Sequence, residues 1–160
     1  MPYGNETVRF PVRKNPRLSR YDYTSGNYYF ITVCTHEKKC IFGYPWELSP
    51  MGIAAADCLQ KIPVHFPGMT VDKWMVMPNH IHAILILPGD GMSLSGIVGQ
   101  YKSAVTKAIH TFCPTIPVWQ TSFHDHIIRN QADYERIWMY IEGNPARWTG
   151  DCFYVPQPEQ

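Results

Sequence analysis

Two histidines alternate inside the stretch MPNHIHAIL, which runs from Met77 to Leu85. Side chains alternate between the two faces of a β-strand, so we expect His80 and His82 on one face and Ile81 on the other. Two imidazoles held side by side on a rigid strand supply half of a metal site, because imidazole is a frequent ligand of divalent transition metals. We therefore favour a metal role at a surface cleft over a hydrogen-bonded core role, and such a role requires a third ligand nearby.

Tyr140 and Asn144 lie four positions apart, so they would share one face of a helix. The amide oxygen of Asn144 could bind a metal, and the phenolic oxygen of Tyr140 could attack an electrophile. Because a phenol has a pKa of about 10, it needs a base or a nearby cation to act as a nucleophile at neutral pH. On spacing alone, a core aromatic at Tyr140 and a helix C-cap at Asn144, before Pro145, is the better interpretation.

A rival tyrosine and a second histidine pair are further candidates. Tyr101 falls on the apolar stripe of its helix, so we expect it in the core. His124 and His126 alternate on a predicted strand and could form a second metal pair. They could also join His80 and His82 in one combined site.

The composition indicates one globular domain without a membrane segment. A chain of 160 residues, 45% hydrophobic and 17% charged, can fill one core and is too short for two ordinary domains. No stretch of about 18 apolar residues and no signal-like leader is found, so we expect a soluble, cytoplasmic protein with no membrane partner. The five cysteines contain no CxxC pair and are expected to be buried free thiols.

Charge is concentrated at the N-terminus, although the chain as a whole carries only +1. The first twenty residues hold five basic and one acidic residue (net +4), which leaves nine basic and twelve acidic residues (net −3). Such an arm could neutralise phosphates, and a solvated tail is an equally good interpretation. Lys102 and Lys107, on the polar side of a helix, could also contact phosphate or simply face solvent. The basic residues of the arm are Arg9, Arg13, Lys14, Arg17 and Arg20.

The elements that must position these residues alternate between strands and helices. Apolar residues recur at steps of three and four after Ser93, a good N-cap, and Pro78 with Asn79 favours a tight turn between two strands. The pattern predicts strands at 28–35, 40–48, 70–77, 80–87 and 118–130, and helices at 49–62, 93–112 and 131–145. This order implies an α+β, ferredoxin-like antiparallel sheet with helices packed on one face.

Four motifs in order resemble the REP-associated tyrosine transposases, relatives of the single-strand insertion-sequence transposases in the one-tyrosine HUH superfamily. They are YYFITVCTHEKKCIFG, MPNHIHAIL, WQTSFHDHIIRN and YIEGNP, and the likeness runs from about Leu18 to Trp148. The resemblance implies a single HUH-type catalytic domain at 21–150, between a basic arm at 1–20 and a short C-terminal tail at 151–160.

The resemblance also implies a specific chemistry. His80, His82 and Asn144 would bind a divalent ion, Mn²⁺ or Mg²⁺, and Tyr140 would cut single-stranded DNA through a 5′-phosphotyrosine that can be rejoined. Imidazole ligands suit Mn²⁺ better than Mg²⁺. The partner would be DNA with a hairpin or palindromic repeat. Asp125 and His126, which match the strand motif, would support the site indirectly, and Lys102 and the arm would contact DNA.

Two other functions stay open on the sequence. A metal-dependent phosphodiester hydrolase would use water in place of Tyr140. A catalytically inactive ferredoxin-like module would only bind nucleic acid. Relatives include both monomers and domain-exchanged dimers, so the oligomeric state stays open as well.

Overall fold

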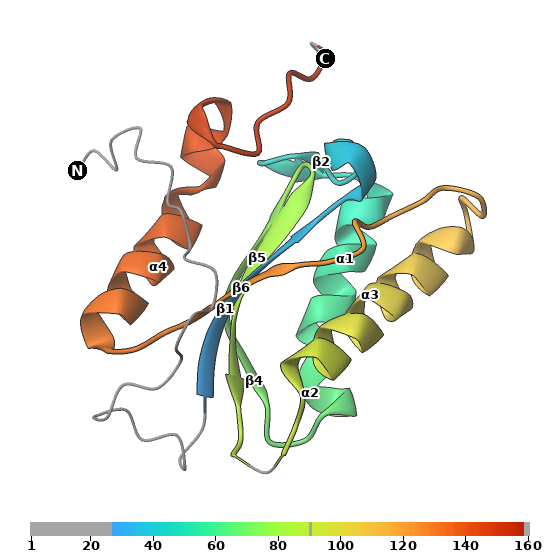
Figure 1. Ribbon diagram of the computed structural model, residues 1–160. Coiled ribbons are helices and arrows are strands. Elements are labelled where there is room, and N and C mark those ends of the chain that lie inside the picture. The colour runs from blue at the N-terminus through green and yellow to red at the C-terminus, as the bar shows by residue number, and fades with distance from the viewer. Residues whose placement is uncertain (1–26, 90, 159–160) are drawn as a thin grey trace.

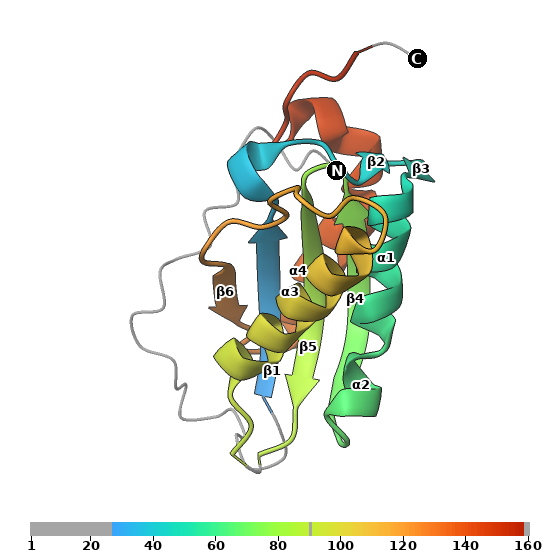
Figure 2. The same cartoon turned by 90° about the vertical axis from the view of Figure 1, so that its right-hand side faces the viewer.

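A four-stranded antiparallel sheet, in the order β4-β5-β1-β6, forms the centre of the molecule (Figures 1 and 2). The structure is a computed structural model and describes residues 27–89 and 91–158, so the basic arm lies outside the described residues. The strands of this sheet are β1 (Asn27–Cys34), β4 (Thr70–Met77), β5 (His80–Leu87) and β6 (His124–Ile127). The helices are α1 (Pro50–Gln60), α2 (Ile62–His65), α3 (Leu94–His110) and α4 (Gln131–Gly143), with short 3₁₀ turns η1 (His36–Lys38) and η2 (Pro145–Gly150).

The predicted α+β class with an antiparallel sheet is confirmed, but the helices cover both faces of the sheet. Helices α1 and α3 pack on one face and α4 on the other (Figure 1). On β1, Ile31 joins the α1/α3 core and its neighbour Phe30 joins the α4 core. The expectation of one covered face was wrong because β1 and β5 are apolar on both faces, which is typical of strands buried from two sides.

Three helices begin with a side-chain cap, and of these caps the sequence predicted Ser93. The Ser49 side chain accepts a hydrogen bond from the Gly52 amide at the start of α1, and Ser93 accepts one from the Gly96 amide at the start of α3. Asn130 caps α4 in the same way. Each cap satisfies a backbone donor that has no partner inside its helix, so the local sequence is sufficient to begin these helices.

Two predicted strands differ from the structure. The segment 40–48 forms a separate small hairpin of β2 (Gly43–Tyr44) and β3 (Glu47–Leu48) instead of joining the main sheet. The segment 118–130 contributes only four residues, as β6, to the edge next to β1. The β4–β5 hairpin with its turn at 78–79 is confirmed.

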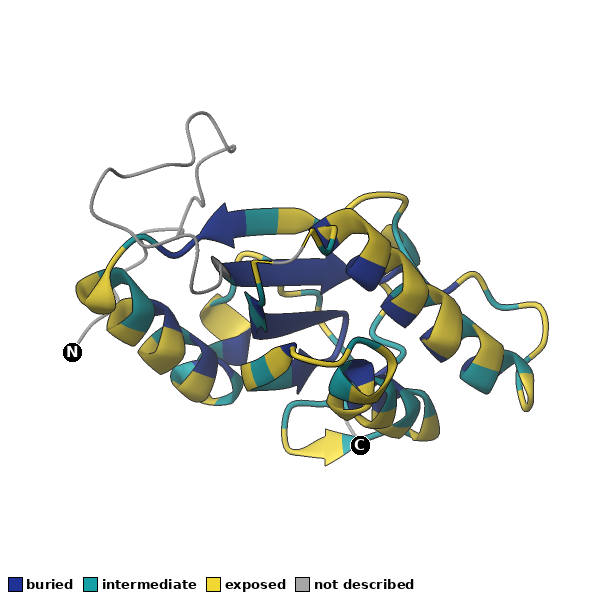
Figure 3. Cartoon of the chain, turned by 90° about the horizontal axis from the view of Figure 1, so that it is seen from below, coloured by how far each residue is buried: buried dark blue, intermediate teal, exposed yellow. Residues whose placement is uncertain are grey.

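Burial follows the layers of the fold. The central strands β1 and β5 are mostly buried, whereas β4 and β6 at the sheet edges are only partly buried and the helices are exposed on their outer faces (Figure 3). None of the described helices is long and apolar enough to cross a bilayer.

Candidate active site

The two histidines of β5 lie on the face of the sheet that α4 covers. His80 is opposite Cys34 of β1, and His82 is opposite Thr32. Their Nε2 atoms are 3.1 Å apart, and both side chains are 0% exposed. The expected shared face is therefore present, but the expected surface cleft is wrong, because the chain beyond η2 folds back over the pair.

Each imidazole is held through its Nδ1 atom. Nδ1 of His80 donates to Oδ1 of Asn79 at 2.8 Å, and Nδ1 of His82 lies 2.8 Å from the hydroxyl of Thr32. A hydroxyl can donate or accept, so Thr32 is compatible with either tautomer of His82. When Nδ1 carries the proton, Nε2 offers its lone pair, which is the arrangement found for histidines that bind metals.

Burial keeps both imidazoles in the neutral form. It lowers the pKa of His80 well below its usual value, and the neighbouring His82 lowers it further. Burial likewise lowers the pKa of His82 to about 3, although a hydrogen bond involving the Ile31 backbone opposes the shift. At neutral pH the two Nε2 atoms are therefore available as ligands without losing a proton first.

Helix α4 brings Tyr140 beside the histidines. The buried side chains of Ile137 and Ile141 anchor the helix on the sheet, and the ring of Tyr140 lies 5.4 Å from the ring of His82, centroid to centroid. Burial raises the pKa of the phenol, and the nearby Asp151 raises it further, whereas Asn144 and Arg147 act in the opposite direction. Tyr140 is only partly buried, in contrast to the two histidines.

Asn144 is both the C-cap of α4 and part of the site. Its backbone amide donates to the Ile141 carbonyl, and its side chain influences the pKa of both His80 and Tyr140. The side-chain Nδ2 donates to Oδ2 of Asp151 at 2.9 Å. The Oδ1 atom is buried and makes no hydrogen bond to any described residue. A buried amide oxygen of this kind suits a cation ligand, because buried polar atoms usually have a partner.

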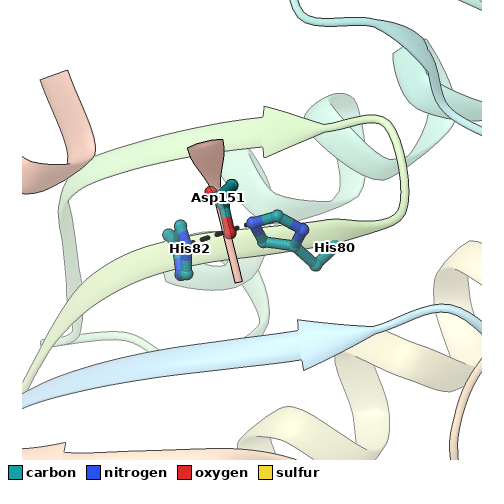
Figure 4. Close-up of side chains that lie close together, drawn as sticks. All are labelled: His80, His82 and Asp151. Carbon is teal, nitrogen blue, oxygen red and sulfur yellow. Dashed lines mark hydrogen bonds between the residues drawn. The ribbon is translucent and has the colours of Figure 1, made fainter. Parts of the chain in front are cut away.

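Asp151 completes the group and was missed by the sequence analysis. One carboxylate oxygen of Asp151 and one ring nitrogen of each histidine all lie within 4.8 Å of one another (Figure 4). Two neutral imidazoles, an amide oxygen and a carboxylate are a donor set that suits a divalent ion. The only signal in the sequence was an acidic residue shortly after the YIEGNP motif, and nothing local indicates that it folds back.

The segment after η2 covers the histidines. The ring of Phe153 lies 4.5 Å from the ring of His80, and that of Trp148 lies 6.1 Å away, centroid to centroid. Hydrogen bonds from side-chain amides to backbone carbonyls hold the segment. Nδ2 of Asn79 donates to the Phe153 carbonyl at 2.7 Å, and Nε2 of Gln157 donates to the Gly43 carbonyl at 2.8 Å. The residues 151–158 thus pack on the domain and shield its histidines from water.

Tyr101 and Lys102 make their hydrogen bonds away from the histidines. Tyr101 is 3% exposed and its hydroxyl donates to the Ala55 carbonyl, which confirms its expected core position. The ammonium of Lys102 donates to the Gln120 carbonyl at 2.6 Å, on the α3 side of the sheet. It therefore ties a loop to α3 on the face opposite the histidines.

The second histidine pair does not assemble a metal site. Nε2 of His126 is hydrogen-bonded to Oδ2 of Asp133 at 2.8 Å, and His124 is exposed. Asp125 is opposite Ile31 of β1, so its side chain is on the face away from His80. Within residues 27–89 and 91–158, the only group of three or more His, Cys, Asp or Glu side chains close enough to hold an ion is His80, His82 and Asp151. The basic residues of the arm lie outside the described residues.

The chain is similar in sequence to known proteins. A protein of Haemophilus influenzae named only as uncharacterized is 31% identical over 168 residues, which cover 89% of this chain and 93% of that protein. A REP-associated tyrosine transposase of Escherichia coli K12 is 34% identical over 77 residues, which cover 48% of this chain and 44% of that enzyme.

A solved structure shows the same likeness. The structure of a REP-associated tyrosine transposase bound to a REP hairpin aligns with a TM-score of 0.63 and 26% identity, over 82% of this chain and 73% of that one. These relatives confirm the resemblance inferred from the motifs. Residues 23–144 match the sequence family described as Transposase IS200 like, a range that contains both histidines, Tyr140 and Asn144. The chain therefore belongs to the IS200-like transposase family.

Proposed function

We propose that this chain cleaves and rejoins single-stranded DNA beside hairpins, with Tyr140 as the nucleophile and a divalent ion bound by His80, His82 and Asn144. The observation that carries the proposal is the convergence of two elements. Helix α4 sets the phenol of Tyr140 against the ring of His82, and its last turn sets Asn144, whose Oδ1 has no hydrogen-bond partner among the described residues, in the same group.

The chemistry follows from what these groups can do. A bound divalent ion would polarise the scissile phosphate and orient it for in-line attack. Asn79 and Thr32 hold the two imidazoles so that their Nε2 atoms face each other. Mn²⁺ suits this set better than Mg²⁺, because two of the three donors are imidazoles.

The covalent step joins the protein to the 5′-phosphate end of the strand that lies 3′ to the break. The Tyr140 oxygen forms a bond to phosphorus and gives up its proton, while the bond from phosphorus to the 3′ oxygen breaks and that oxygen takes up a proton. The energy of the phosphodiester is kept in the phosphotyrosine, so the reverse reaction can rejoin a strand. Burial, followed by Asp151, raises the pKa of Tyr140 and disfavours the phenolate, and the positive charge of Arg147 only partly opposes this shift.

Hairpin DNA is the proposed partner because of the structural relative. That REP-associated tyrosine transposase was solved with a REP hairpin, and it shares this fold over most of both chains. Single-stranded flanks beside the hairpin would supply the flexible phosphate that an in-line attack requires.

A covalent adduct tests the proposal directly. Incubating the protein with Mn²⁺ and a labelled oligonucleotide that carries a hairpin and single-stranded flanks should give a slow-migrating adduct that resists denaturant. Peptide mass mapping should place it on Tyr140. Tyr140→Phe should lose the adduct and cleavage together while it still binds the oligonucleotide.

Tyr134→Phe is the matched control, because Tyr134 lies on the same helix and bonds Asp72. This variant should still form the adduct. Cleavage by Tyr140→Phe without an adduct would identify water as the nucleophile and the protein as a hydrolase. Hairpin binding by the unaltered protein without any cleavage would instead favour an inactive binding module.

A further inference from the structure

The chain beyond α4 returns to the histidines through η2. The turn closes with the amide of Asp151 donating to the Trp148 carbonyl at 3.0 Å. There, one oxygen of the Asp151 carboxylate lies within 4.8 Å of a ring nitrogen of each imidazole (Figure 4). A carboxylate is a hard oxygen donor with a full charge, and none of the other donors in the group carries one.

Two hydrogen bonds fix the orientation of this carboxylate. Oδ1 accepts from the Phe153 amide at 2.8 Å, and Oδ2 accepts from Nδ2 of Asn144 at 2.9 Å. A carboxylate offers about four lone-pair sites, so these two bonds leave capacity for a further partner. Because Nδ2 of Asn144 is used by Asp151, the unpartnered Oδ1 of the same amide is left for a different partner.

We propose that Asp151 is a fourth ligand of the divalent ion, supplied by the C-terminal segment. The inference rests on the proposed metal role of His80, His82 and Asn144. The added carboxylate moves the donor set toward the oxygen-rich composition that Mn²⁺ and Mg²⁺ prefer, and it removes one unit of positive charge from the site.

A purely orienting role for Asp151 is the competing explanation. Through Nδ2 of Asn144 the carboxylate also holds the amide in place, and loss of such a supporting contact can itself weaken metal binding about 10- to 100-fold. Affinity alone therefore cannot separate a ligand from a support. The test needs a spectroscopic signature that arises only when the side chain at this position touches the ion.

The first measurement is calorimetric titration of the full-length chain with Mn²⁺. Asp151→Asn should bind Mn²⁺ at least tenfold more weakly, because the charged donor is lost. The matched control is Asp57→Asn, which removes an exposed carboxylate from α1 on the other face of the sheet and should leave the affinity unchanged. Unchanged affinity in Asp151→Asn would overturn the proposal.

The second measurement uses Co²⁺ as a spectroscopic probe. Asp151→Cys places a thiolate at the position of the carboxylate, and the Co²⁺-loaded variant should show a thiolate-to-cobalt charge-transfer band in the near ultraviolet. The Co²⁺-loaded unaltered protein, which already contains Cys34 and Cys152, should lack this band. Weakened Mn²⁺ binding in Asp151→Asn without the band in Asp151→Cys would overturn the ligand role and leave an orienting one.

Failure of the underlying proposal gives a different result. Loss of Mn²⁺ binding in His80→Ala/His82→Ala but not in Asp151→Asn would remove only Asp151 from the ligand set. No Mn²⁺ or Co²⁺ binding by the unaltered protein would overturn the metal site as a whole.

Discussion

The two histidines show how burial can prepare a residue for metal binding. A solvent-exposed imidazole titrates near pH 6.5, so protons compete with a metal under mildly acidic conditions. His80 and His82 are fully buried, and their lowered pKa values keep both imidazoles neutral far below pH 7. As a consequence, the folded protein contains two neutral imidazoles that cannot easily take up a proton.

We therefore predict that acid lowers the stability of the metal-free protein. Between pH 6.5 and about 3 the unfolded chain binds a proton at His82 and the folded chain does not. The free energy of unfolding should therefore fall as pH falls, by up to about 1.4 kcal/mol per pH unit for each such histidine. Denaturant titrations in the presence of a chelator at pH 7.5, 6.5, 5.5 and 4.5 measure this slope.

His82→Gln should reduce the slope even if it lowers the stability at every pH. Asp133, whose pKa is about 2 because hydrogen bonds from His126 and Arg136 outweigh the effect of burial, contributes only below about pH 4. A stability that does not change between pH 6.5 and 4.5 would contradict neutral burial of the histidines.

Helix α4 brings Tyr140 and Asn144 to the buried histidines of β5. Ile137 and Ile141, both 0% exposed, fill the space over Phe30 and Ile84 of the sheet. The register of β4 shifts between Val71 and Trp74. The two residues at this irregularity make polar contacts with the helix. Asp72 accepts from Tyr134, and Lys73 pairs with Glu142. A bulge can re-aim side chains in this way, so β4 helps to set the position of α4.

Ile137→Ala should therefore loosen the helix on which Tyr140 stands. The lost contacts and the remaining cavity should lower the free energy of unfolding by about 2–5 kcal/mol, as is usual for a large aliphatic side chain in a core. Met139→Ala is the matched control on the same helix, because Met139 is 52% exposed and its loss should change stability by no more than about 0.5 kcal/mol.

Denaturant unfolding measures both variants, and adduct formation at a temperature where both are folded measures the effect on Tyr140. We expect slower adduct formation only in Ile137→Ala. Equal adduct rates in the two variants would show that packing of α4 does not limit the position of the phenol.

At the scale of the whole molecule, the net positive charge and the proposed catalytic residues lie in different parts of the chain. The positive charge is concentrated in residues 1–20, whereas the rest of the chain has a net charge of −3. A part of the chain with this net charge attracts a polyanion weakly. We therefore expect the arm to supply the affinity for DNA that does not depend on the DNA sequence.

Removal of residues 1–20 should therefore weaken binding to a DNA hairpin and flatten its salt dependence. The slope of log K against log salt should fall by about 0.7–0.9 for each phosphate contact that is lost. Fluorescence anisotropy at several salt concentrations measures both quantities.

A full-length variant with Arg9, Arg13, Lys14, Arg17 and Arg20 all changed to Gln separates charge from chain length. It should behave like the truncated protein, whereas Lys107→Gln, which removes a charge from α3, should retain the steeper slope. Equal slopes for the arm variants and the unaltered protein would exclude the arm from phosphate contact.

Local sequence was sufficient for the elements and for the paired histidines. The local pattern identified α1, α3 and α4, with Ser93 as the predicted cap of α3, and strand alternation placed His80 and His82 on one face. Both kinds of pattern depend on residues a few positions apart. The motif order also indicated the family, which the comparisons confirm. For Tyr140 and Asn144, however, spacing alone favoured core and cap positions, and both descriptions turn out to be compatible with the site.

Tertiary structure alone decided which surfaces meet. Helix α4 takes the face opposite α1 and α3 because Phe30 and Ile84 leave an apolar surface there, a preference that no single segment contains. The return of the chain through η2 brings Asp151 to the histidines and buries them, by contacts between residues more than 70 positions apart in the sequence, such as Asn79 with Phe153. Local periodicity cannot encode such contacts, since they depend on the packing of surfaces that form only when the whole chain folds.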